Sequence, residues 1–159
     1  MQNTISLIKS FFEDCKWNYE FDEDKNVFTT NINMGGIIGL LRIYIFVRDT
    51  DYRVYTILNS NAEKNVYTRV AEYLHRVNYG VHDGNFEFDY RDGEIRYKTY
   101  VNFEGITLSP GIIEDSIFVT IFMFEKYGKN LFRAMLENED VESLVRDAEK
   151  ENVGEPRDD

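Results

Sequence analysis

The side chains that most often do chemistry are scarce in this 159-residue chain. His75 and His82 are its only histidines, and Cys15 is its only cysteine. Zinc sites take nitrogen and sulfur ligands at characteristic spacings, and these three residues match none of them. His82 beside Asp83 could form an acid–base pair, but this pattern is commoner in turns, and no third convergent group is visible. We therefore predict no metal and no cofactor.

Other motifs that could bind or react with a ligand have a simpler interpretation. The acidic run at residues 22–24 lacks the spacing and the closing glutamate of a calcium loop. The glycine-rich stretch at residues 35–39 lies between two predicted strands, without the lysine and following helix of a phosphate-binding loop. Ser109, followed by Pro110, is typical of a helix cap and does not form a nucleophile elbow. The sequence therefore predicts a protein that is not an enzyme.

The charge of the chain argues against two classes of partner. The formal net charge is −11, so phosphate backbones and anionic lipid surfaces are repelled unless a local basic stripe offsets the field. The basic residues are scattered, and Arg91, Arg96 and Lys98 come nearest to a cluster. No apolar run is long enough to span a bilayer, and no signal-peptide pattern is present. We expect no nucleic acid and no membrane, and the single cysteine suits a cytoplasmic location.

Length and composition indicate how many domains to expect. Hydrophobic residues make up 43% of the chain and aromatic residues 15%, which is enough to bury a core. Neither a linker nor an internal repeat interrupts the pattern. We predict one α+β domain over residues 1–150, followed by a disordered acidic tail over residues 151–159.

The first half of the chain has the pattern of a helix followed by a meander. Apolar residues at helical spacing predict a helix over 4–15, capped by Asn3 or Thr4. Alternating residues then predict strands over 17–21, 27–34, 37–47 and 52–58, separated by turn signals. In the third strand, Leu41, Ile43, Ile45 and Val47 occupy one face, while Arg42, Tyr44, Phe46 and Arg48 occupy the other.

The second half predicts a helix, a hairpin and a long helix. Ser60 and Glu63 match a capping box before a helix over 62–78, which a left-handed cap at Gly80 would end. Residues 86–90 and 95–103 alternate around a hairpin signal at 91–93. Ser109 and Pro110 begin a helix over 110–136, and apolar residues support a further short helix over 141–148.

Aromatic side chains on the less apolar faces of these elements are the remaining candidates for function. An amphipathic helix that is apolar beyond its core stripe either lies deep inside the protein or meets a partner, and both readings stay open here. The candidates for protein interaction are Tyr44, Phe46, Tyr55, Tyr100, Phe118, Phe122 and Phe132.

The last three of these aromatic residues lie off the apolar stripe of the 110–136 helix, which contains Ile113, Ile117, Ile121 and Phe124. A twofold homodimer through this helix would cover an exposed aromatic face. Alternatively, the first helix or the 141–148 segment folds back over the rings and leaves a monomer.

Several segments of the second half resemble a known family. Residues 70–78, 84–89, 93–98 and 108–110 are similar to the YbjN family, described as sensory-transduction regulators, whose fold is similar to that of type III secretion chaperones. The first half matches only by element order, and the acidic segment after Met135 has no counterpart. No catalytic residue belongs to the shared motif. The resemblance therefore implies a fold and a non-enzymatic interaction role.

These observations predict an α+β fold and a binding function. We expect an antiparallel sheet of about five to six strands, packed on one side by the helices over 4–15, 62–78 and 110–136. The chain would be a cytoplasmic module of chaperone-like fold that binds an unidentified protein partner, with a regulatory role. The alternative is a small-molecule sensor or enzyme with a pocket between the long helix and the sheet. Its polar groups would come from Tyr97, Tyr100, Arg96 and Glu114.

Overall fold

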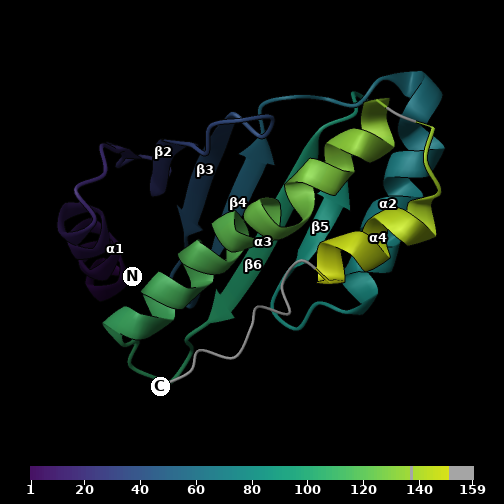
Figure 1. Ribbon diagram of the computed structural model, residues 1–159. Helices are drawn as coiled ribbons and strands as arrows, with labels where there is room; N and C mark the ends of the chain where they lie inside the picture. The colour runs from purple at the N-terminus through teal and green to yellow at the C-terminus, as the bar shows by residue number, and fades with distance from the viewer. Residues whose placement is uncertain (137, 151–159) are drawn as a thin grey trace, which may run out of the picture.

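A computed structural model describes residues 1–136 and 138–150, which form one antiparallel sheet and a helical layer. The sheet has six strands in the order β1-β2-β3-β4-β6-β5. Figure 1 shows α3 crossing in front of the sheet, with α1 beside one end and α2 and α4 beside the other. The predicted tail over 151–159 lies outside the described residues. The elements are α1 (Gln2–Asp14), β1 (Glu20–Asp22), β2 (Val27–Asn33), β3 (Leu40–Val47), β4 (Asp51–Leu58), η1 (Lys64–Val66), α2 (Tyr67–Tyr79), β5 (Asn85–Phe88), β6 (Ile95–Asn102), α3 (Pro110–Leu136) and α4 (Val141–Lys150).

Short turns make the antiparallel pairing possible. The 35–39 stretch forms the β2–β3 turn, where Gly39 N–H donates to the Gly35 carbonyl at 3.1 Å. Both glycines have positive φ, which a residue without a Cβ adopts at little cost. Arg48 N–H donates to the Asp51 carbonyl at 2.8 Å and closes the β3–β4 turn. The turn predictions at these two positions are confirmed.

The core lies between the sheet and the helices. One face of β3 is fully buried, as its alternation predicts, and so is the matching face of β4. At the other end of the sheet α1 packs on β2, where the rings of Phe12 and Phe28 lie 5.8 Å apart. The predicted α+β sheet with helices on one side is therefore confirmed.

Buried polar side chains join α3 to the sheet. The Tyr52 hydroxyl lies 2.8 Å from Ser116 Oγ, and Thr56 Oγ1 lies 2.5 Å from Thr120 Oγ1. Thr99 Oγ1 donates to the Ser116 carbonyl at 2.9 Å. Because an unpaired polar group in the core is costly, these bonds set the position of α3 along β4 and β6.

The long helix begins and ends where the sequence predicts. Ser109 Oγ accepts a hydrogen bond from Ile112 N–H at 3.4 Å, and Pro110 is the first helical residue. The second half of α3 extends beyond β4 and packs against α2 and α4. Tyr73 Oη donates to the Tyr127 carbonyl at 2.9 Å, and Asn130 Nδ2 donates to the Leu144 carbonyl at 3.1 Å.

The expected capping box at Ser60 and Glu63 is wrong. Helix α2 begins at Tyr67 without a side-chain cap, after the short 3-10 helix η1. The residues before η1 bind the β5–β6 turn instead: Ala62 N–H donates to the Gly93 carbonyl at 3.0 Å. These tertiary hydrogen bonds hold the segment in an extended conformation, so the helix starts later than the local pattern predicts.

Four other predictions of local structure are also corrected. Gly80 ends α2 in a right-handed conformation, with φ −96°. Helix α1 begins at Gln2 after Met1, so Asn3 and Thr4 lie inside the helix and do not cap it. The strand expected over 17–21 is replaced by the shorter β1 at Glu20–Asp22, because Trp17 N–H donates to the Phe12 carbonyl at 2.9 Å and its ring packs against α1. The strand expected from residue 37 begins at Leu40, because residues 35–39 form the turn.

Candidate functional site

Four of the aromatic candidates lie together on the sheet face opposite the helices. Tyr44, Phe46, Tyr55 and Tyr100 occupy the strand positions that alternate with the buried residues of β3, β4 and β6. Phe46 is 41% exposed and Tyr100 is 52% exposed. In Figure 1 this face points away from the viewer, behind the strands that α3 crosses. We call it the open face.

The aromatic rings of the open face, together with Arg53, form a connected row across three strands. Tyr44 and Tyr55 are directly opposite each other in the β3–β4 register. The Phe46 ring lies 5.7 Å from the Tyr55 ring in an edge-to-face arrangement. Arg53 and Tyr100 are opposite in the β4–β6 register, and the Arg53 guanidinium carbon lies 5.7 Å from the Tyr100 ring centre. Such contacts hold neighbouring side chains in defined orientations.

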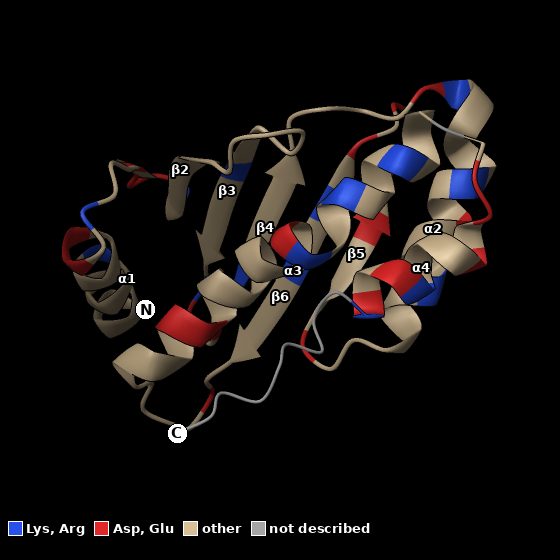
Figure 2. Ribbon diagram, in the orientation of Figure 1, with Lys and Arg blue, Asp and Glu red and all other residues tan. Residues whose placement is uncertain are grey.

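A shallow hollow of about 570 Å³ lies over this row. Its charged residues are all basic, and its remaining lining is aromatic and aliphatic. Arg42 is the one charged residue of β3, whose ribbon is otherwise tan in Figure 2, so β3 contributes no negative charge here. The lining residues are Lys25, Tyr44, Phe46, Val47, Arg48, Arg53, Tyr55, Ile57 and Arg96.

The basic residues at the β6 end of the open face share the Glu87 carboxylate, and Arg96 Nη1 also lies 3.8 Å from Glu94 Oε1. Arg96 Nη2 lies 2.7 Å from Glu87 Oε2, and the Lys98 ammonium also binds this carboxylate. Partial burial alone would raise the pKa of Glu87, but the hydrogen bonds from Lys98 and Arg96 outweigh it and hold the pKa below its usual value. Glu87 is therefore ionised at neutral pH and neutralises part of this corner.

The basic residues at the other end of the hollow are less fully neutralised. Arg53 Nε lies 3.8 Å from Asp51 Oδ1, an atom that is buried and has no hydrogen bond among the described residues. Lys25 is paired with Asp22 at 3.1 Å, but its side chain is 77% exposed. Arg48 is exposed, and no carboxylate of the described residues lies within ion-pair distance of it. An anion could therefore approach Arg48 and Lys25 without displacing a buried partner.

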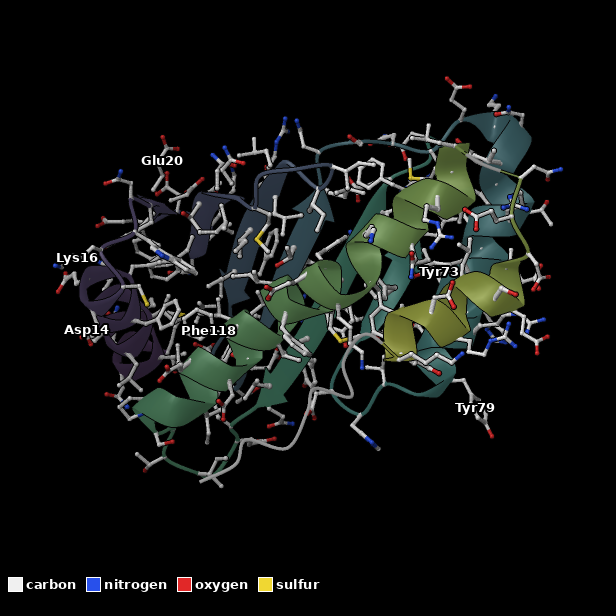
Figure 3. The ribbon with its side chains drawn as sticks, in the orientation of Figure 1. Asp14, Lys16, Glu20, Tyr73, Tyr79 and Phe118 are labelled. Carbon is white, nitrogen blue, oxygen red and sulfur yellow. The ribbon has the colours of Figure 1, made fainter. Side chains whose placement is uncertain are left out.

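The three aromatic candidates on α3 differ in how far their side chains are exposed. Phe132 is only 7% exposed although it lies off the predicted stripe, so it is buried and presents little surface to a partner. Phe118 is 37% exposed, and its ring lies 5.4 Å from that of Phe11 and 5.8 Å from that of Trp17. Figure 3 shows Phe118 between α3 and α1, so the first helix covers part of it, as one alternative expected. Phe122 remains 49% exposed.

A groove of about 820 Å³ separates α3 from the end of β6. It corresponds in place to the pocket of the small-molecule alternative, but the four predicted polar groups do not converge there. Tyr97 is buried and its hydroxyl donates to the Asp83 carbonyl, and Arg96 occupies the opposite sheet face. Tyr100 is among the residues that line the groove, but its ring lies beside Arg53 of the open face. Glu114 is exposed and contributes to the field at Cys15. The proposed polar set is therefore not assembled.

The residues that could bind a metal or act as nucleophiles do not gather into a site. Within residues 1–136 and 138–150, no group of three or more His, Cys, Asp and Glu residues could hold a metal ion. His75 and His82 are both exposed and lie on different segments. Burial raises the pKa of Cys15, and the charges of Glu114 and Asp14 raise it further, so its thiol is a poor nucleophile at neutral pH. No helix in the described part of the chain is long and apolar enough to cross a membrane.

Sequence reasoning missed the basic half of this site. It recognised Arg96 and Lys98 with Arg91, but did not connect Arg96 with Lys25, Arg48 and Arg53. A signal was present, because Arg53 and Arg96 alternate with the buried residues of their strands and so had to face away from the core. Their convergence depends on the β4–β6 pairing, which links segments separated by a whole helix.

The comparisons with known proteins are informative about the fold. No protein-family model and no curated protein matches the sequence. A chain of the ExsC–ExsE complex superposes with a TM-score of 0.56 at 11% identity, over 82% of this chain and 94% of that one. YbjN from E. coli, a proposed transcription regulator, superposes with a TM-score of 0.53 at 8% identity, over 78% of this chain and 92% of YbjN. The fold is therefore similar to that of YbjN, as the sequence resemblance predicts, and to that of the chain from the ExsC–ExsE complex.

Proposed function

We propose that this chain is a non-enzymatic module that binds another protein through the open face. The observation that carries the proposal is the connected row of partly exposed aromatic residues on a sheet face that none of the described helices covers. Tyrosine, phenylalanine and arginine are common at the centres of protein interfaces, where they supply contact area and oriented hydrogen bonds. The open face combines all three.

The fold comparison supports the same class of function. One structural neighbour is known in a protein–protein complex, and the other is a proposed regulator. We extend from them only the general role, a binding module that acts on a partner in the cytoplasm and regulates it.

The test compares open-face variants with a distant aromatic variant. Phe46→Ser and Tyr100→Ser remove exposed rings from the open face, whereas Tyr79→Ser removes a ring that is 96% exposed at the end of α2 (Figure 3). Tagged proteins are incubated with native lysate, and captured proteins are quantified. We expect a saturable partner for wild type and Tyr79→Ser, and loss of that partner for both open-face variants. Equal capture by all four proteins, or no saturable partner for wild type, would contradict the proposal.

The groove between α3 and β6 keeps the small-molecule alternative open. Its volume is sufficient for a metabolite, and Phe122 and Val119 give it an apolar wall. A thermal-shift screen of nucleotides, metabolites and metals distinguishes the two functions, because a ligand in large excess over its dissociation constant stabilises the folded state. A reproducible hit that Phe122→Ser abolishes would favour the sensor or enzyme.

The homodimer through α3 stays a prediction, and its interface would depend mainly on Phe122, whose ring is the most exposed of the three aromatic candidates on α3. Phe118 already packs against α1, so its loss should lower the melting temperature, while Phe122→Ser should leave the fold intact. Light scattering at micromolar concentration should give the mass of two chains for wild type and of one chain for Phe122→Ser. A wild-type mass of one chain would exclude the dimer at that concentration.

A further inference from the structure

The charged residues that line the hollow on the open face are opposite in sign to the net charge of the chain. Acidic residues outnumber basic ones 29 to 18, yet all four charged residues that line the hollow, Lys25, Arg48, Arg53 and Arg96, are basic. Electrostatic interactions between exposed charges extend only about 8 Å at physiological ionic strength. Within that range Lys25 is paired with Asp22, Arg53 with Asp51, and Arg96 with Glu87 and Glu94. Arg48 has no carboxylate within ion-pair distance among the described residues, so it is the least neutralised cation that a ligand in the hollow meets.

Two of these cations are held in place by the aromatic row. The Arg96 guanidinium carbon lies 4.5 Å from the Tyr55 ring centre, and that of Arg53 lies 5.7 Å from the Tyr100 ring centre. A guanidinium placed over a ring can still use its N–H edge to bind a carboxylate with two parallel hydrogen bonds. Arg53, 33% exposed and 3.8 Å from Asp51, has room for that contact. Arg96 already directs Nε and Nη2 to Glu87, so it supports the aromatic row and is not expected to bind the ligand.

We propose that the open face recognises an acidic, apolar segment of its protein partner, with carboxylates on Arg48, Arg53 and Lys25 and apolar side chains on Phe46. This inference rests on the proposed function and specifies the chemistry of the partner. Charge complementarity is its basis, because the hollow presents positive charge without a lining carboxylate beside an apolar surface. Arg48, which has no carboxylate partner among the described residues, is the first contact expected.

The ring geometry favours a peptide over a single-stranded nucleic acid. Stacked bases need aromatic faces that are free to receive them. The face of Tyr55 is occupied by Arg96, that of Tyr100 by Arg53, and Phe46 meets Tyr55 with an interplanar angle of 82°. Only Tyr44 and Phe46 come near a parallel arrangement, with an interplanar angle of 31°. The row can accommodate leucine or phenylalanine side chains at the ring edges, but beyond this pair it offers no series of parallel platforms for bases.

The experiment measures fluorescence anisotropy with three labelled probes and the intact protein. The probes are a peptide of alternating Glu and Leu or Phe, the same peptide with Lys in place of Glu, and an oligothymidine of matched length. We expect saturable binding of the acidic peptide that weakens with added salt, and much weaker binding of the other two. Tighter binding of the lysine peptide or of the oligothymidine would overturn the proposal.

Charge-neutralising variants locate the binding site. Arg48→Gln with Arg53→Gln should weaken binding of the acidic peptide by roughly tenfold or more, since two charge-assisted contacts are lost. Arg53 lies beside the buried Asp51 carboxylate, so its loss could destabilise the fold. A second double variant, Lys25→Gln with Arg48→Gln, changes exposed side chains only and therefore tests the charges in a folded protein. Lys64→Gln, exposed on η1, is the matched control and should bind like wild type.

The outcomes separate this inference from the proposed function. Suppose that Phe46→Ser abolishes capture of the partner, while both charge-neutralising double variants bind the acidic peptide and the partner like wild type. The open face then binds a protein but does not recognise the partner's carboxylates, and the inference is wrong. If Phe46→Ser and Tyr100→Ser retain the partner, the proposed function itself is wrong. Loss of the acidic peptide in both charge variants, with Lys64→Gln unaffected, supports the inference.

Discussion

The stability of the outer edge of β5 should depend on one side chain of α2, that of Asn78. Asn78 Oδ1 accepts a hydrogen bond from Phe86 N–H at 2.8 Å, and Asn78 Nδ2 donates to the Phe86 carbonyl at 2.9 Å. The side-chain amide thus occupies the place that a further strand would take at this edge. Without it, the last strand of the sheet would present unpaired backbone groups, which is a common weakness of edge strands.

The cost of removing this amide follows from its two bonds. In Asn78→Ala the Phe86 N–H loses its partner, and an unsatisfied, largely buried donor costs about 1–3 kcal/mol. The Phe86 carbonyl loses less, because Asn85 Nδ2 still donates to it at 3.1 Å. We expect a loss of about 2 kcal/mol in the free energy of unfolding, which corresponds to about 4–8 °C in melting temperature for a chain of this length.

Urea unfolding followed by circular dichroism measures this loss, and hydrogen exchange locates it. Asn65→Ala, at an exposed position of η1, is the matched control and should stay within about 0.5 kcal/mol of wild type. In Asn78→Ala the Phe86 amide should exchange faster, while amides in the centre of β3 keep their relative order of protection. Equal stability of Asn78→Ala and wild type, with an unchanged Phe86 amide, would refute the assignment of the edge to this side chain.

Three further predictions concern other parts of the fold. Gly93→Ala should lower the free energy of unfolding in urea by about 2 kcal/mol or more, because φ is +80° and the new Cβ would lie 2.2 Å from the Ala62 carbonyl oxygen. Gly105→Ala, where φ is +76° and the space is open, should cost less, and equal costs for the two variants would contradict the steric argument. The lowered pKa of Glu87 implies stability that is present above its unfolded pKa and lost as pH falls through the folded value, so Glu87→Gln should flatten the stability curve between about pH 5 and pH 3. Cys15, whose pKa burial raises, should react with a thiol reagent at pH 7 more slowly in the folded protein than in urea, and equal rates would refute that burial effect.

Much of the secondary structure could be predicted from the sequence because it is local. The 110–136 helix has its cap and its first-turn proline in two consecutive residues, Ser109 and Pro110, and its apolar stripe has helical spacing throughout. The strict alternation of residues 41–48 determined which face of β3 is buried, and the glycines of the 35–39 stretch determined its turn. In each case the energetic preference depends on neighbours a few residues apart, which a sequence displays directly.

Where a local signal competes with tertiary contacts, the tertiary contacts determined the structure. Ser60 and Glu63 match a capping box, but the segment binds the β5–β6 turn, and its backbone hydrogen bonds to that turn outweigh the cap. Phe118 and Phe132 lie on the same helix outside the predicted stripe. Phe118 remains partly exposed beside α1, whereas Phe132 is buried in the half of α3 that packs against α2 and α4. Helical spacing places side chains around an axis but does not say which neighbours will cover them.

The candidate site was likewise predicted in part from the sequence and determined in part by the tertiary structure. From the sequence alone, alternation identified Tyr44, Phe46, Tyr55 and Tyr100 as residues facing away from the apolar side of their strands. Only the strand order β3-β4-β6 joined them into one row and brought Arg96 over Tyr55, because the chain makes α2 and β5 before β6 returns to pair with β4. That return is selected by burial of the sheet under α1, α2 and α3 together, a cooperative gain that no local segment encodes.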